Sequence, residues 1–134
     1  MSDHVSKEKR SEIMRSVKST HTKLEDRITK DLWQYGLRFR KNTKSLPGKP
    51  DISLKKKKKV VFIDSCFWHG CPDHFRLPKT NKEFWETKIK RNIKRDKEIS
   101  SLYLSKNWEI LRVWEHDIKF NYPDVLEKII NFLR

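Results

Sequence analysis

The hydrophobic pattern near the start of the chain predicts a helix behind a basic arm. Residues 7–19 are polar and basic, and Met14 and Val17 stand at helical spacing within them. This segment forms either a short helix or an arm that orders only on a partner. The next segment opens with Thr22–Glu25, which has the form of a capping box, and its helical pattern stops at Gly36. We therefore expect a helix between these points.

Two further stretches predict helices in the second half of the chain. Residues 80–83 (TNKE) form a second capping box and open a long, charged helix. Phe84 and Ile89 would face inward in that helix and Lys88 outward. Residues 122–133 are amphipathic and carry a proline suited to a first helical turn.

The remaining apolar segments predict strands. Leu37–Lys41 alternates apolar and basic residues, as a half-exposed strand should. Asp51–Leu54 follows a loop rich in proline and glycine, and Val60–Ile63 is a continuous apolar run typical of a strand buried on both faces. Trp108–Trp114 also reads as a central strand. Lys55–Lys59 joins two strands, and we favour a solvated hairpin connection over a DNA contact.

The order of these elements is α, β, β, β, α, β, α, which predicts an α/β fold with a small mixed sheet and helices on both faces. The 134 residues suit one domain with a modest core. No repeat or linker divides the chain. We expect an N-terminal arm over residues 1–20 and a single domain over residues 21–134.

The charge of the chain indicates its partner. Lys and Arg number 32 against 18 Asp and Glu, giving a net charge of +14. Such a chain attracts polyanions, of which nucleic acid is the commonest, although a merely soluble basic protein is the alternative. No apolar run approaches the roughly 20 residues that span a bilayer. The first ten residues do not resemble a signal peptide, so we expect a cytoplasmic protein with no membrane partner.

A group of potential zinc ligands follows the strand at residues 60–63. Cys66, Cys71 and His74 offer three donors, and in a reducing compartment the two cysteines suit a metal better than a disulfide. A fourth donor must come from a distance, and His116, just past a neighbouring strand, is the best candidate. The alternative is that the cysteines are small buried residues and His74 lies in a surface loop.

Two aspartates and a histidine suggest a second metal site. Asp51 begins one strand and Asp64 ends the next, so a hairpin would place the two carboxylates side by side. Carboxylate oxygens suit Mg²⁺, which can polarise a phosphoryl oxygen and activate water. His69 is not needed for zinc and could take a proton from that water. Glu25 is best explained, from the residues alone, as part of the capping box.

Three aromatic residues lie beside these polar groups. Phe67 and Trp68 stand between candidate ligands, and Trp85 lies in the basic start of a helix. Exposed aromatics can stack on bases or wedge between them and kink a duplex. Core packing is the alternative for each.

Several stretches of the chain together resemble the very-short-patch-repair (Vsr) endonucleases. The resemblance extends from about Ser11 to Glu115. It is carried by residues 47–51 (PGKPD), 61–70 (VFIDSCFWHG), 77–80 (LPKT), 83–92 (EFWETKIKRN), 95–96 (RD) and 108–115 (WEILRVWE). It implies a restriction-endonuclease-like fold and a strand-specific nick 5′ to the thymine of a T:G mismatch, the product of 5-methylcytosine deamination.

The resemblance also implies roles for individual residues. Asp51 matches the catalytic aspartate that binds magnesium, with the main-chain carbonyl of Ile63 as a further ligand, and His69 matches the general base. Glu25 matches an acidic residue near metal-bound waters, which reverses its assignment as a cap. Cys66 and Cys71 fall where zinc ligands fall. The expected DNA contacts are Phe67, Trp68 and Trp85, which intercalate, Lys88 and Asn92, which read the mismatched pair, and Met14 and Val17, which close over the minor groove.

Three positions depart from the family pattern. Asp64 stands where part of the family has histidine, and it is either a second metal-binding carboxylate or a structural substitute. His116 stands where cysteine is common. The spacing around His74 differs from that of some relatives. Cys66 occupies the place where related nucleases carry a catalytic lysine, so lysine chemistry is not expected.

These observations predict a zinc-stapled, magnesium-dependent DNA nickase that acts on duplex DNA with a T:G mismatch. We expect a monomer, with mismatch-repair proteins as further partners. The rivals are a restriction-type nickase, or one that recognises a different mismatch, and a zinc-containing DNA-binding module without catalysis.

Overall fold

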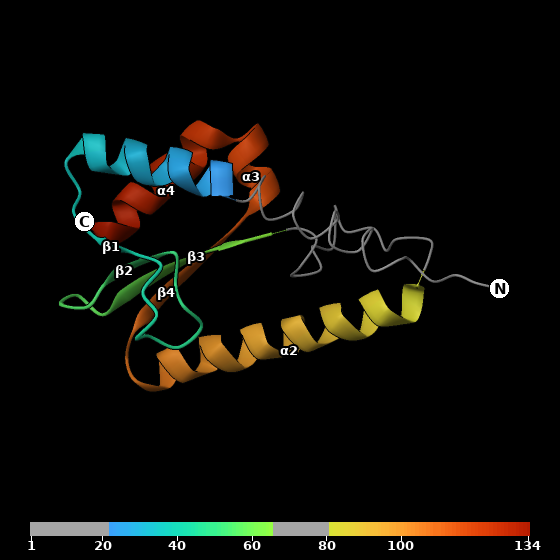
Figure 1. The fold of residues 1–134 in the computed structure, drawn as a ribbon. Helices are drawn as coiled ribbons and strands as arrows, with labels where there is room; N and C mark the ends of the chain where they lie inside the picture. Colours follow the sequence, from blue (N-terminus) through green and yellow to red (C-terminus); the bar gives the residue numbers. More distant parts are fainter. Residues whose placement is uncertain (1–21, 66–80) are drawn as a thin grey trace.

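The computed structural model describes residues 22–65 and 81–134. A four-stranded sheet lies between two helical layers (Figure 1). In chain order the elements are a first helix over residues 22–35, β1 (Arg40–Lys41), β2 (Ile52–Leu54), β3 (Lys59–Asp64), α2 (Lys82–Ser105), β4 (Glu109–Trp114), α3 (Glu115–Phe120) and α4 (Tyr122–Leu133). The first helix, α3 and α4 cover one face of the sheet, and α2 lies along the other. The mixed α/β architecture expected from the sequence is confirmed.

The strands lie in the order β1-β2-β3-β4. Two antiparallel pairs, β1 with β2 and β2 with β3, are followed by a parallel pair, β3 with β4. The parallel register runs from Lys59 opposite Glu109 to Asp64 opposite Trp114. Both β3 and β4 therefore end at the same edge of the sheet.

Alternation along β3 divides the core in two. Val61 and Ile63 face the layer of the first helix, α3 and α4, where they pack with the buried residues Ile28, Leu32, Ile52, Val113, Ile118, Val125, Ile129, Ile130 and Leu133. Val60 and Phe62 face α2 and pack with Tyr103. Successive strand residues point to opposite faces, so a continuous apolar run is needed to serve both layers. The prediction of a strand buried on both faces was right.

The lysine-rich turn between β2 and β3 lies at the opposite end of the sheet from the end of β3 (Figure 1). Lys59 donates from Nζ to the carbonyl of Phe132 at 2.6 Å, and Lys57 donates to that of Leu133 at 3.2 Å. Cations near the last carbonyls of a helix satisfy these acceptors and complement the helix dipole. Part of the lysine run therefore caps α4.

The first strand is shorter than the alternating pattern predicts. Only Arg40 and Lys41 pair with β2. The preceding residues end the first helix instead: Gly36 and Leu37 donate main-chain hydrogen bonds to the carbonyls of Trp33 and Leu32. Gly36 has φ +109°, a conformation that glycine adopts without the strain of a Cβ.

Both capping-box predictions were wrong in detail. Thr22 is already helical, so it does not cap the first helix. Helix α2 has Asn81 as its N-cap, with φ 54° and no side-chain capping hydrogen bond. Asn tolerates the left-handed region better than most residues. Helix α3 was not predicted, because its six residues are too few to show a helical period. Helix α4 begins at Tyr122, as predicted.

The N-terminal arm assigned to residues 1–20 lies outside the described residues. Within the described part of the chain, no helix has the length and apolar character needed to cross a membrane.

Candidate active site

Asp51 occupies the position where the chain enters β2, next to the end of β3. Its Oδ2 accepts a hydrogen bond of 2.6 Å from the main-chain N–H of Ile63. Pro50, directly before it, is fully buried. A proline fixes its own φ and restricts the residue before it, so the approach to Asp51 is constrained. The carboxylate is thus held against the edge of β3 that faces β2.

Glu25 reaches Asp51 from the first helix. Its side chain is buried, with 8% exposed, and Oε1 has no hydrogen-bond partner within residues 22–65 and 81–134. The pKa of Asp51 is raised from 3.8 to about 7. Burial is the largest cause, and the charges of Glu25 and Asp64 and a hydrogen bond with Glu25 act in the same direction, whereas the hydrogen bond from the Ile63 amide lowers the pKa. Two carboxyl groups forced together share a proton for this reason. Glu25 therefore faces Asp51 instead of reaching back to cap its own helix.

This pair fits a hard divalent cation. Mg²⁺ is usually held by one or two carboxylates together with waters. The N–H and C=O of one strand residue project to the same side of the strand, so the carbonyl of Ile63 lies on the side from which its amide meets Asp51. Within residues 22–65 and 81–134, no three His, Cys, Asp or Glu side chains form a group that could hold a metal ion. The described part of the chain offers two carboxylates and the Ile63 carbonyl as oxygen ligands, and waters would complete the coordination of Mg²⁺.

Asp64 lies on the face of the sheet toward α2 and is paired with a cation. Its Oδ1 accepts from Nη1 of Arg112 at 2.9 Å, and Asp64 is buried, with 6% exposed. Arg112 also donates to Oγ of Ser100 at 2.9 Å and to the carbonyl of Asp96 at 3.3 Å. These bonds join β3, β4 and α2. This geometry gives Asp64 a structural role; its catalytic role stays a prediction.

Arg112 was missed as a partner of this site. The sequence contains a usable signal, because alternation places Arg112 on the same face of β4 as its register neighbour on β3, Phe62. Asp64 is two residues further along that face. The arginine therefore lies one step diagonally from the aspartate, within reach for a long side chain.

Among the expected zinc ligands, only His116 lies in the described part of the chain. It occupies the start of α3, stacks on Trp114 at 6.3 Å between ring centroids, and places Nε2 3.2 Å from Oδ1 of Asp117. Asp64 and Trp114 pair at the end of the parallel register, and Cys66 and His116 each come two residues later in the sequence. The other expected ligands and contacts that lie outside the described residues are Cys66, Cys71, His74, His69, Phe67, Trp68, Met14 and Val17.

The aromatic pair at the start of α2 is oriented differently from the prediction. Trp85 is fully buried and Phe84 only partly buried, so the expectation that Phe84 is the inward-facing residue was wrong. Their rings meet edge to face at 4.9 Å. Both positions lie within one turn, and a helical period does not decide between neighbours. Intercalation by Trp85 stays a prediction, and it requires the ring to leave this buried position.

The other expected DNA contacts on α2 are more accessible. Lys88 is partly exposed and lies with Nζ 6.0 Å from the centroid of the Phe84 ring. Asn92, one turn later, lines a cleft beside the loop that leads to Asp51.

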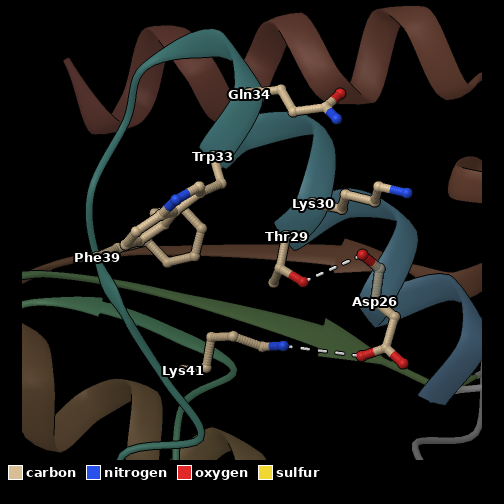
Figure 2. Close-up of a pocket in the computed structure, with 7 residues that line it drawn as sticks. All are labelled: Asp26, Thr29, Lys30, Trp33, Gln34, Phe39 and Lys41. Carbon is tan, nitrogen blue, oxygen red and sulfur yellow. Dashed lines mark hydrogen bonds and ion pairs between the residues drawn. The ribbon is translucent and has the colours of Figure 1, made fainter.

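A second hollow, of about 460 Å³, lies between the first helix and the segment that carries Phe39 and Lys41 (Figure 2). The ring of Trp33, 47% exposed, meets Phe39 edge to face at 5.7 Å. At the other end of the hollow, Nζ of Lys41 lies 3.7 Å from Oδ1 of Asp26. Figure 2 shows the aromatic and charged ends separated along the helix. No pattern in the sequence predicts this hollow.

The sequence of the chain is similar to those of known DNA endonucleases. The family description "DNA mismatch endonuclease Vsr" matches residues 2–74 of the chain. The chain belongs to the Vsr family. Similar proteins include the type II nicking enzyme V.NmeDIP of Neisseria meningitidis serogroup C, 42% identical over 134 residues that cover 98% of this chain and 90% of the relative.

Two further Vsr relatives show the same range of similarity. The type II nicking enzyme V.HpaIIP of Haemophilus parainfluenzae is 42% identical over 89% of this chain and 86% of its own. The DNA mismatch endonuclease Vsr of Escherichia coli strain K12 is 38% identical over 86% of this chain and 74% of its own. The resemblance noted in the sequence is therefore confirmed at the level of the family, which is one of DNA endonucleases.

Proposed function

We propose that this protein nicks one strand of duplex DNA 5′ to the thymine of a T:G mismatch by magnesium-dependent hydrolysis. The observation that supports it most is the buried pair of Glu25 and Asp51 against the Ile63 amide. A pair of carboxyl groups that raises the pKa of one member to about 7 is costly unless a cation neutralises it. Membership of the Vsr family and the net charge of +14 support DNA as the substrate.

In this proposal each residue of the site has a physical task. Asp51 and the main-chain carbonyl of Ile63 would hold the cation, with Glu25 beside its waters, and the Ile63 amide fixes the orientation of the Asp51 carboxylate. Magnesium, when bound, supplies Lewis-acid polarisation of a phosphoryl oxygen and of water. His69 takes the proton from the water that attacks phosphorus. Asp64, held by Arg112, secures the end of β3 beside Asp51.

Recognition of the substrate is assigned to the residues that the family resemblance names. Phe67, Trp68 and Trp85 would intercalate beside the mismatch, since a mispaired step costs less to unstack than a paired one. Lys88 and Asn92 would read the mispaired bases. Met14 and Val17 would close over the minor groove. Zinc held by Cys66, Cys71, His74 and His116 would staple the chain after β3 to the start of α3.

A second candidate is a strand-specific nickase with a different target. It is favoured by the names of two of the relatives, which are called type II nicking enzymes. The chemistry would be unchanged. A binding module without catalysis is disfavoured, because it leaves the buried pair of Glu25 and Asp51 without a task.

A nicking assay tests both candidates. Labelled duplexes carrying T:G, other mismatches or no mismatch, in varied flanking sequences, are incubated with and without Mg²⁺. We expect cleavage only at T:G and only with the metal. Cleavage of matched or differently mismatched duplexes would favour the second candidate, and cleavage in excess chelator would contradict the metal mechanism.

Asp51→Asn should lower the single-turnover rate at least about 10³-fold, because removing one preorganised electrostatic group from an active site costs on the order of 10²–10³ and this group also holds the cation. DNA affinity should be retained. Glu127→Gln, a neutralisation on the exposed face of α4, is the matched control and should cut normally. Unchanged cutting by Asp51→Asn would contradict the assignment.

A further inference from the structure

A polar cleft of about 490 Å³ lies between the loop over residues 42–50 and the middle of α2. Its charged lining comprises Lys44 and Lys49 from the loop and Arg95 and Asp96 from the helix. The three cations are exposed. Three cations and one anion around a hollow favour an anionic ligand.

The loop that forms one wall is fixed to α2. The hydroxyl of Tyr103 donates to the carbonyl of Pro47. Gly48, with φ +74°, packs so closely that an added Cβ would lie 2.9 Å from Cγ2 of Ile99. This contact leaves room only for glycine. The hydrogen bond and the close contact therefore hold this wall of the cleft against α2.

Lys49 is held in an uncommon backbone conformation. Its φ is 51°, in the left-handed region that few non-glycine residues adopt, and its N–H donates to the carbonyl of Leu46 at 3.1 Å. Such positions carry a cost and cluster where the side chain is needed in one direction. Here the side chain lines the cleft.

The cleft lies close to Asp51 along the chain. Lys49 precedes Asp51 by two residues, which span at most about 7 Å of extended backbone. A nucleotide adds 3.4 Å of rise along one DNA strand. A phosphate bound by Lys49 would thus lie within a few nucleotides of the carboxylates. Asn92, assigned to reading the mismatch, lines the same cleft from α2.

We propose that Lys44, Lys49 and Arg95 bind a backbone phosphate of DNA adjacent to the scissile phosphate and so set the position of the cut relative to Asp51. Because the loop joins the cleft to Asp51 through a buried proline, the bound phosphate and the hydrolytic site keep a fixed spacing. This inference rests on the proposed function, since it assumes that DNA occupies the site of Asp51.

The charge contribution is measured by titration with salt. In an Asp51→Asn background, which prevents cutting, Lys49→Gln with Arg95→Gln should lower the slope of log affinity against log salt by about 1, because the slope counts the phosphates neutralised and the cleft binds one. If the affinities converge near 1 M salt, this corresponds to a loss of about tenfold at 0.1 M. Lys128→Gln, an exposed lysine on α4, is the matched control for charge.

The position of the contact is tested by replacing single phosphates with neutral methylphosphonates along both strands. We expect one position next to the nick site to weaken binding by the Asp51→Asn protein about tenfold at 0.1 M salt. The same replacement should have no further effect when Lys49 and Arg95 are also changed. Equal losses of affinity in both proteins at every position, or an unchanged salt slope, would contradict the proposal that this cleft binds a backbone phosphate.

The two proposals fail in different ways. If the wild-type protein does not nick T:G duplexes but the methylphosphonate effect disappears with Lys49 and Arg95, the cleft is supported and the proposed substrate is wrong. If T:G duplexes are nicked normally and at the same bond by Lys49→Gln with Arg95→Gln, the substrate is supported and the cleft does not set the position of the cut.

Discussion

The two ends of strand β3 differ in how their charges are neutralised. At the start of the strand, Lys59 has carbonyl acceptors at the end of α4 and lies 3.6 Å from Glu109. At its end, Asp51 and Glu25 are buried together, and within residues 22–65 and 81–134 the Ile63 amide is the group that lowers the pKa of Asp51. Asp64, at the same end, is matched by Arg112. At this end the pair assigned to catalysis carries unfavourable charge.

The charges at the start of β3 therefore stabilise the fold, whereas the pair of carboxyl groups at its end is assigned to function. A net charge of +14 suggests that acidic groups should find cations easily. The pair of Asp51 and Glu25 is instead buried together, and the raised pKa of Asp51 shows that ionising this carboxyl group is unfavourable there. Perturbed titration of this kind is characteristic of functional sites.

The largest expected effect is on the pH dependence of stability without metal. The pKa of Asp51 is raised to about 7 in the folded state, above its unfolded value of 3.8. Asp51 therefore contributes no penalty below pH 3.8, and stability is lost as the pH rises from about 4 to 7. The loss is as much as about 4 kcal/mol from this group.

Urea unfolding in chelator at pH 5 and pH 8 measures the part of this loss that falls above pH 5, about 3 kcal/mol. Asp51→Asn should remove most of the difference, and added Mg²⁺ at pH 8 should restore stability only to the wild-type protein, because a ligand stabilises the state that binds it. Glu127→Gln serves again as the control. If the Asp51→Asn protein showed the same pH dependence as the wild type, ionisation of Asp51 would not be the cause of the lost stability.

The next largest effect is on the stability contributed by the ion pair of Asp64 and Arg112 at the end of β3. Arg112→Gln should destabilise the fold by about 3 kcal/mol, since removing one partner of a buried ion pair leaves the other charge uncompensated. Arg112→Gln combined with Asp64→Asn should recover part of that loss. Chemical denaturation of the two proteins measures this, and a loss below about 1 kcal/mol for the single change would argue against a structural role for Asp64.

Glu25→Gln should act on Asp51 directly. It removes a neighbouring negative charge, so the pKa of Asp51 should fall, and the rate of nicking should drop about 10- to 100-fold, as for changes to groups that support metal ligands. The readouts are the pH profile of the rate and the Mg²⁺ concentration needed for half-maximal activity. A lower rate with an unmoved profile would contradict the coupling of the two carboxyl groups.

The smallest effect is expected at the lysine end. Lys59→Met should cost about 1 kcal/mol through lost bonds to the last carbonyls of α4, with no change in nicking. Lys56→Gln, on the exposed turn, should stay within about 0.5 kcal/mol of the wild type. A nicking defect in Lys59→Met would show that the two ends are not independent.

Much of the fold could be predicted because its strongest signals are local. The apolar run at residues 60–63 requires two buried faces, and the proline after Tyr122 marks the start of α4. The limits of β1 could not be predicted, because the hydrogen bonds of Gly36 and Leu37 go to the end of the first helix. Those contacts depend on where that helix stops.

The candidate site was predicted unevenly for a similar reason. Asp51 and Asp64 could be placed together because a hairpin and a period of two determine their positions. The pairing of Glu25 with Asp51 depends on how the first helix lies across the sheet, which a capping motif does not indicate. The burial of Trp85 over Phe84 likewise depends on the rotation of α2, and adjacent helical positions differ by only about 100°.

The register of the sheet has a consequence for how the protein folds. Ile52 pairs with Val61 nine residues later, whereas Val61 pairs with Leu111 fifty residues later. Closing the shorter loop costs less chain entropy, and non-local pairing slows folding. The meander of β1, β2 and β3 should therefore assemble first, and β4 should join it in the rate-limiting step, when the crossover through α2 is complete.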